Sequence, residues 1–153
     1  MTLQLRRAVE GDAAKVFPWR NDETVRRVSL DTREIAWEEH RDWFCRTLER
    51  ADRNLLIAED GEMPVGVLRF DVEGDVAEIS IFLDPKLVGR GYGSAMLREG
   101  ATWARRNLVG VAILRAKVKP DNPASSRAFE KAGFAEAWRV YDLSLCGAKI
   151  PPN

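Results

Sequence analysis

Three glycines at alternate positions, Gly89, Gly91 and Gly93, stand between an apolar segment and a helical pattern. A strand, a glycine-rich turn and a helix together can bind phosphate, because the first amides of a helix have no backbone acceptor and carry partial positive charge. Glycines also let a phosphate approach the backbone closely, and Arg90 adds a suitable charge. The pattern by itself equally allows a turn whose glycines only adopt positive φ.

Two common nucleotide-binding motifs do not fit this loop. It has no Gly-Lys-Ser/Thr ending, so it is not a P-loop. A Rossmann fingerprint needs a wider glycine spacing in a first βαβ unit, with an acidic residue about 20 residues later. Here the loop comes late in the chain and follows strands joined by short turns. The loop therefore predicts neither an ATP nor an NAD site.

The elements around the loop predict an α+β domain with a mixed, mostly antiparallel sheet flanked by helices. Helical patterns cover residues 11–22 (with Pro18 interrupting or ending the helix), 22–30, 35–52, 94–108 and 122–134, the last ended by Gly133. Strand patterns cover residues 3–9, 54–60, 65–72, 76–85, 111–120 and 137–145. Turn residues between the second, third and fourth strands predict an antiparallel meander.

Length and charge limit the class of protein. The chain has 153 residues with 24 Lys plus Arg and 24 Asp plus Glu, which predicts one domain, residues 1–146, followed by a tail, residues 147–153. A net charge of zero argues against a nucleic-acid binder. Cys45 and Cys146 fit no metal spacing and indicate a reduced, cytoplasmic protein. No signal-peptide core or membrane-length apolar run is seen, so we expect no membrane association.

Two motifs together resemble the GCN5-related N-acetyltransferase (GNAT) family. The first is the loop Asp84 to Leu97, and the second is Asn122 with Glu130 to Phe134. Val88 departs from the Gln or Arg of the family pattern. The resemblance implies the GNAT fold, acetyl transfer from acetyl-CoA to a primary amine, and acetyl-CoA as co-substrate. The residues that match the family's CoA-binding positions are Phe82, Leu83, Gly89, Arg90, Gly91, Tyr92, Gly93, Ser94, Asn122 and Phe129. For Asn122, a helix N-cap is an equally good interpretation.

Within that resemblance Glu78 is the predicted catalytic base. Members of the family often place a glutamate on the strand before the loop, and a half-buried carboxylate is a better proton acceptor near neutral pH than an exposed one. The alternative is an exposed strand glutamate with no role. The family's usual acid, a tyrosine that protonates the leaving thiolate, corresponds to Phe129, which cannot donate a proton. Tyr92, Ser126 and Tyr141 are weaker candidates, and a catalytically silent CoA-binding module stays possible.

A narrower resemblance concerns the acceptor. The stretches Pro18 to Asp22 and Glu38 to Phe44 resemble the branch that acetylates the 4-amino group of UDP-linked deoxy-amino sugars for pseudaminic acid, and similar patterns occur in acetyltransferases of ribosomal-protein N-termini. The resemblance implies a small-molecule amine acceptor, a nucleotide sugar, with protein N-termini as the alternative, and by analogy a homodimer. The implied acceptor contacts are Trp19, Arg20, Asn21, His40 and Trp43, although aromatic residues at helical spacing more often pack in a core.

Overall fold

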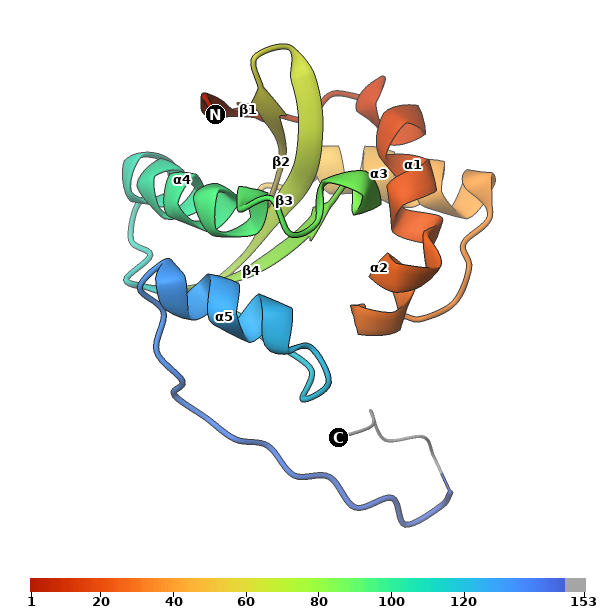
Figure 1. Cartoon of the computed structure of the whole chain (residues 1–153), viewed down its shortest axis with the longest axis vertical. Coiled ribbons are helices and arrows are strands. Elements are labelled where there is room, and N and C mark those ends of the chain that lie inside the picture. Colours follow the sequence, from red (N-terminus) through yellow and green to blue (C-terminus); the bar gives the residue numbers. More distant parts are fainter. Residues whose placement is uncertain (148–153) are drawn as a thin grey trace.

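The computed structural model describes residues 1–147, and five strands form one sheet in the order β1-β2-β3-β4-β5 (Figure 1). The first four strands pair antiparallel, and β4 pairs with β5 in parallel. This mixed, mostly antiparallel sheet with flanking helices confirms the predicted α+β class. The strands are β1 (Leu3–Arg7), β2 (Arg53–Asp60), β3 (Met63–Glu73), β4 (Val76–Leu83) and β5 (Ile113–Arg115).

Helices cover both faces of the sheet, and each face has its own apolar cluster. On one face lie α1 (Asp12–Asn21), α2 (Glu23–Val28) and α3 (Trp37–Glu49); on the other lie α4 (Tyr92–Asn107) and α5 (Pro123–Lys131) (Figure 1). Side chains alternate between the faces along each strand. Thus Val67 packs with the α1 and α3 cluster, whereas Leu68 packs with the α4 and α5 cluster.

Two glycines leave room for helix α4 and the sheet to pack against each other. A Cβ at Gly100 would lie 2.8 Å from Leu68 Cδ2, and one at Gly66 would lie 2.7 Å from both the Met96 side chain and the Phe82 carbonyl oxygen. Real Cβ atoms do not approach a backbone atom this closely, so Gly66 requires glycine. At Gly100 a larger residue would force the end of the Leu68 side chain to shift. This contact fixes where α4, and therefore the glycine loop before it, sits relative to β4.

Pro18 does not interrupt the first helix. Helix α1 continues past it to Asn21. A proline removes one helical hydrogen bond, and here the buried side chains Ala13 and Val16 hold the helix against the rest of the cluster. The predicted interruption at Pro18 is therefore wrong.

The two C-terminal strand predictions also need correction. The strand predicted at residues 111–120 is regular only at Ile113–Arg115, because only these residues pair with β4. The strand predicted at 137–145 has no pairing partner in the described residues and runs as an extended, exposed segment (Figure 1). Of the predicted tail, only Gly147 lies within the described residues.

Within residues 1–147 no helix has the length and apolar composition that crossing a bilayer requires.

Candidate functional site

The strands β4 and β5 separate after a short paired stretch. Their register joins Val76 to Ile113, Ala77 to Leu114 and Glu78 to Arg115, and stops there, while β4 continues to Leu83. Beyond Glu78 the outer edge of β4 therefore has no strand beside it among the described residues. We call this gap the β4–β5 opening. It exposes strand backbone that can pair with an extended ligand.

Glu78 stands where the β4–β5 opening begins. Its side chain is 30% exposed, and Lys117 Nζ lies 3.2 Å from Glu78 Oε2. Leu83, at the other end of the β4 edge, is about 17 Å away at about 3.3 Å per residue. A carboxylate and a glycine loop thus mark the two ends of one exposed strand edge.

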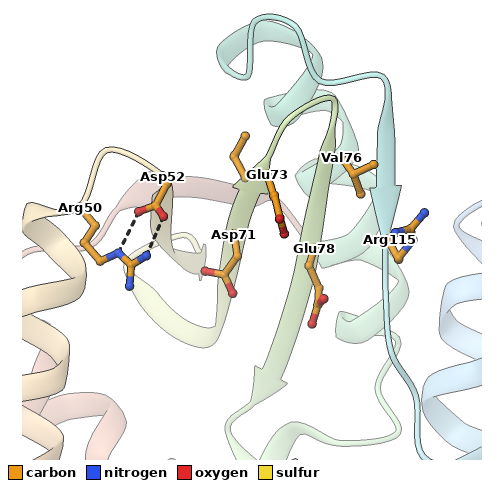
Figure 2. Close-up of a pocket in the computed structure, with 8 residues that line it drawn as sticks. Arg50, Asp52, Asp71, Glu73, Val76, Glu78 and Arg115 are labelled. Carbon is orange, nitrogen blue, oxygen red and sulfur yellow. Dashed lines mark hydrogen bonds and ion pairs between the residues drawn. The ribbon is translucent and has the colours of Figure 1, made fainter.

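A shallow depression of about 630 Å³ surrounds Glu78 (Figure 2). Figure 2 shows Asp71, Glu73 and Glu78 on the neighbouring strands β3 and β4, with Arg50 and Asp52 on one side and Arg115 on the other. Arg50 pairs with Asp52 at 2.6 Å. The lining is therefore mixed in charge, with carboxylates at its centre and arginines on both flanks.

Asp71 lies directly opposite Glu78 in the strand register. Facing like charges on neighbouring strands destabilise a sheet unless cations compensate them. Asp71 has two such cations, since Arg53 Nε lies 3.2 Å from Oδ1 and Arg69 donates to Oδ2 at 3.0 Å. Within residues 1–147, Glu78 pairs only with Lys117, whose side chain is 64% exposed and easily displaced. Of the two carboxylates, Glu78 is the one more available to a ligand amine.

The glycine loop ends in an uncapped helix. Gly91 has φ of +86° and is the N-cap of α4, with no side-chain hydrogen bond capping the helix, and Gly89 has φ of +82°. Helix geometry leaves the amides of Tyr92, Gly93 and Ser94 without intrahelical acceptors. A 16-residue helix adds its dipole at this end. The geometry fits an anion such as a pyrophosphate, with Arg90 exposed beside it.

Tyr92 has a structural contact at this loop. Its hydroxyl donates to Asp60 Oδ2 at 2.7 Å, joining the start of α4 to the end of β2. This hydrogen bond raises the pKa of Tyr92 and lowers that of Asp60. The other tyrosine of the chain, Tyr141, is 86% exposed in the C-terminal segment. Neither tyrosine hydroxyl lies among the residues that line the depression around Glu78.

Asn122 and Phe129 both have packing or capping roles in helix α5. Asn122 Oδ1 accepts a hydrogen bond from the Ser125 amide at 3.2 Å, so Asn122 is the N-cap of α5. Phe129 is 8% exposed and meets Phe134 edge to face at 5.0 Å between ring centroids. Its ring therefore belongs to the core cluster under α4 and α5.

The predicted acceptor residues of α1 hold the loop between α2 and α3. Asn21 donates from Nδ2 to the Ile35 carbonyl and accepts from the Ile35 amide, at 2.7 and 2.8 Å. Arg20 donates to the Asp31 carbonyl at 3.0 Å, and its partial burial lowers its pKa. Trp19 packs against the α1 and α3 cluster. These contacts shape the rim of that face, and none of the three residues lines the depression.

His40 and Trp43 lie differently although both are on α3. His40 is 4% exposed, its Nε2 lies 2.9 Å from the Ala13 carbonyl, and burial lowers its pKa, so a neutral ring donates this bond. Trp43 lines a second depression beside the first. The guanidinium of Arg69 lies 5.5 Å from its ring centroid and also bonds Asp71. Trp43 is thus connected to the carboxylate cluster, whereas His40 joins α3 to α1.

Sequence reasoning missed Asp71, Glu73, Lys117 and Arg115. A signal for the first two was present, because the two-residue turn Gly74-Asp75 pairs Glu73 with Val76 and hence Asp71 with Glu78. Lys117 and Arg115 had no such signal, since their place depends on where β5 meets β4.

Acetyl-CoA fits the described residues on two independent observations. The uncapped, glycine-preceded start of α4 suits a pyrophosphate, and the open edge of β4 suits an arm with amide groups. Residues Phe82 and Leu83 contribute that edge by their backbone.

Known proteins share this architecture. The sequence profile of the GNAT acetyltransferase domain matches residues 2–135. A putative phosphinothricin acetyltransferase of Bacillus subtilis, YwnH, is 31% identical over 143 residues, covering 82% of this chain and 85% of the relative.

Solved structures agree in fold. The aminoglycoside acetyltransferase AAC(6')-Ib in complex with coenzyme A has a TM-score of 0.79 at 19% identity over 89% of this chain and 86% of its own. RimL, a ribosomal-protein alpha-N-acetyltransferase in complex with coenzyme A, has a TM-score of 0.76 at 24% identity, covering 88% of this chain and 80% of its own. The chain belongs to the GNAT family and is an acetyl-CoA-dependent N-acetyltransferase.

Proposed function

We propose that this enzyme acetylates the primary amine of a small molecule that also carries an anionic group. The observation that carries the proposal is the position of Glu78 at the start of the β4–β5 opening, next to Arg115 in the strand register. One side chain suits an ammonium and the other an anion.

Glu78 is the proposed base. An acceptor amine arrives as its ammonium and must lose a proton before it can attack a carbonyl carbon. Glu78 takes that proton directly or through a water, and the incoming ammonium replaces Lys117 as its ionic partner. Acetyl-CoA supplies the activated acetyl group as a thioester. The edge of β4 and the start of α4 hold it, so the two substrates meet in a fixed orientation.

The acceptor class follows from the charges around Glu78. Asp71 is already compensated by Arg53 and Arg69, while Arg115 has no ion-pair partner among the described residues. An acceptor with an amine and an anion can bind Glu78 and Arg115 together. Two known kinds of acceptor have both groups: an amino acid such as phosphinothricin, named for the relative YwnH, and a UDP-linked amino sugar, which the sequence pattern of α1 and α3 indicates. A purely cationic polyamine would be repelled by the positive charge of Arg115.

Two other functions remain as outcomes of the test. A protein N-terminus is also an amine, but RimL is similar only in fold. The silent CoA-binding module is the outcome that Phe129 would favour, because it replaces the tyrosine that usually serves as acid. In an active enzyme water can protonate the departing thiolate.

The test is an acceptor panel with acetyl-CoA, followed by release of free thiol. The panel holds phosphinothricin, a UDP-4-amino sugar, spermidine and a short peptide with a free N-terminus. Turnover with either of the first two supports the proposal, and their ranking selects the finer acceptor. Turnover only with spermidine or only with the peptide rejects it, and CoA binding by calorimetry with no turnover indicates the silent module.

A further inference from the structure

Lys117 is an amine of the protein itself that lies where an acceptor amine is needed. Its Nζ is 3.2 Å from Oε2 of Glu78, the proposed base. Within residues 1–147 no other lysine contacts a carboxylate at ion-pair distance. Because the Lys117 side chain is 64% exposed, the ion pair adds little to stability, and the amine is placed as a bound substrate would be.

The backbone on both sides of Lys117 is held in place. Ala116 and Val118 are partly buried and pack against the core cluster under α4 and α5. Burial alternates along residues 114–118, so Lys117 points away from that cluster. Its flexible four-carbon stem can still move the amine around Glu78. The fold therefore fixes where the side chain starts and leaves its amine free to react.

The strand register sets Lys117 across the β4–β5 opening from the strand edge that suits acetyl-CoA. Glu78 of β4 pairs with Arg115 of β5 in parallel (Figure 2). The same offset carried two residues further sets Lys117 opposite Ser80, which lies between Glu78 and Leu83 on β4. An acetyl group that is placed for transfer to an amine beside Glu78 is therefore also within reach of Lys117.

Lys119, two residues later, has its amine in a different place. Its Nζ lies 3.3 Å from the carbonyl oxygen of Arg27, in the last turn of α2. A carbonyl oxygen accepts a hydrogen bond from an ammonium but does not take its proton. Lys119 thus has the same side chain in the same segment without a base beside it, which makes it the matched control for Lys117.

We propose that the enzyme acetylates its own Lys117, once per chain, and that this modification leaves Glu78 open to acceptor amines. The inference rests on the proposed function, because it takes Glu78 as the base and acetyl-CoA as the acetyl donor. Before modification, Lys117 and an acceptor ammonium compete for the same carboxylate. The modified chain has no such competitor.

The transfer balances as aminolysis of a thioester. Lys117 begins as an ammonium and gives one proton to the Glu78 carboxylate, which passes it to solvent. The freed electron pair of Nζ forms a bond to the thioester carbon of acetyl-CoA, and the bond between that carbon and sulfur breaks. The sulfur leaves with that bond's electron pair and takes the second Nζ proton through water. The products are acetyl-lysine, which stays on the chain, and free CoA.

Acetylation changes the charge beside the base. Acetyl-lysine is neutral, so its ion pair to Glu78 is lost. An acceptor ammonium then binds Glu78 without displacing another cation. Because an exposed ion pair is weak, we expect the KM for the acceptor to fall by up to about fivefold. The modification thus adjusts affinity for the acceptor and leaves the start of α4 unchanged.

The first experiment incubates the intact enzyme with acetyl-CoA and no acceptor, and locates acetyl groups by mass spectrometry of the protein and its peptides before and after incubation. We expect wild type and Lys119→Arg to carry one acetyl group, on Lys117, added with a rate constant that does not depend on protein concentration. Lys117→Arg should carry none, because its guanidinium keeps the charge and stays protonated. Glu78→Gln should be acetylated about 10²-fold more slowly.

The result is separable from that of the acceptor panel. If the enzyme turns over an acceptor while Lys117 stays unmodified, self-acetylation is rejected and the proposed function stands. Equal acetylation of wild type and Glu78→Gln, or acetyl groups spread over several lysines, also rejects it. If neither Lys117 nor any acceptor of the panel is acetylated, the proposed function fails together with the inference.

The second experiment tests the competition, using whichever of phosphinothricin and the UDP-4-amino sugar is turned over. Lys117→Arg keeps a positive charge beside Glu78, and Lys117→Gln removes it as acetylation does. Wild type preincubated with acetyl-CoA and Lys117→Gln should share a low acceptor KM, and that of Lys117→Arg should be higher by up to about fivefold. Preincubated Lys119→Gln should match the wild type. Equal KM values for Lys117→Gln and Lys117→Arg would overturn the role of Lys117 as a competitor.

Discussion

At the scale of single residues, the charges around Glu78 separate two similar carboxylates. Asp71 and Glu78 face each other across β3 and β4, yet Asp71 is held by two arginines and Glu78 by one exposed lysine. The more strongly compensated carboxylate serves the sheet. The less compensated one, Glu78, is free to meet an incoming amine.

Glu78→Gln should lower kcat at pH 7 by about 10²–10⁴-fold, the usual worth of a positioned base. The loss should shrink at high pH, because more of the amine is then already deprotonated. The matched control is Glu73→Gln, since Glu73 lines the same depression and makes no ion pair within the described residues. Turnover is followed by thiol release from pH 6 to 10. An unchanged rate in Glu78→Gln would remove it as the base.

Arg115→Gln should raise the KM for an anionic acceptor about fivefold and leave the KM for acetyl-CoA unchanged. An exposed ionic contact is worth up to about 1 kcal/mol, and added salt should reduce the difference between the two proteins. Arg106→Gln is the control, because Arg106 is exposed at the end of α4, the helix that covers the opposite face. Equal acceptor KM values for wild type and Arg115→Gln would show that the anion binds elsewhere.

At the scale of elements, the start of α4 is the part most sensitive to a small change. Gly91 has φ of +86°, where a β-branched residue is strained by about 1–3 kcal/mol. Gly91→Val should therefore raise the KM for acetyl-CoA by tenfold or more and weaken CoA binding in calorimetry by a similar factor.

Gly110→Val is the control that separates backbone strain from loss of the anion site at the start of α4. Gly110 has φ of +84° in the turn after α4, so its replacement strains the backbone equally but leaves the loop intact. Both variants should lose stability, and only Gly91→Val should lose CoA affinity. If the two behave alike in CoA binding, the start of α4 is not the CoA site.

The elements also show what could be predicted from the sequence. Helix α3 and the β2-β3-β4 meander were predictable because hydrophobic periodicity and turn residues are local signals. Because Glu78 lies on β4 and the glycine loop follows that strand, the positions of both could also be predicted. The extent of β5 was not predictable, since it depends on where β4 stops offering a partner. The strand at residues 137–145 was predicted because its residue types favour strands. Within the described part of the chain, no other strand lies beside this segment to pair with it.

The residues of α1 and α3 that were predicted to contact the acceptor show what helical spacing leaves open. Arg20, Asn21 and His40 have side chains that suit a ligand, but each bonds a backbone carbonyl in another element. Spacing along a helix tells which residues share a face, and it does not tell whether that face meets a substrate or a neighbouring loop.

At the scale of the whole molecule, the pH dependence of unfolding depends on groups that join elements. Asp12 is 1% exposed and accepts hydrogen bonds from both terminal nitrogens of the Arg6 guanidinium. This hydrogen bonding lowers the pKa of Asp12, so its contribution is complete above its unfolded value of about 3.9 and is lost only as the pH falls further. His40 affects the free energy of unfolding at higher pH.

Burial lowers the pKa of His40 in the folded state, whereas the unfolded chain titrates near 6.5. Below about pH 6.5 the unfolded state binds the extra proton, so the free energy of unfolding should fall as the pH decreases from 7.5 to 5.5, by at most about 1.4 kcal/mol per pH unit. His40→Gln keeps an N–H donor for the Ala13 carbonyl but has no proton to gain. Urea unfolding at a series of pH values should therefore give a flatter curve for His40→Gln than for the wild type between pH 7.5 and 5.5. Near pH 4 and below, Asp12 of the unfolded chain takes up a proton before Asp12 of the folded chain does, so the stability of both proteins falls there. Parallel curves across the upper window would mean that His40 is protonated equally in both states and that the contact between α1 and α3 tolerates the charge.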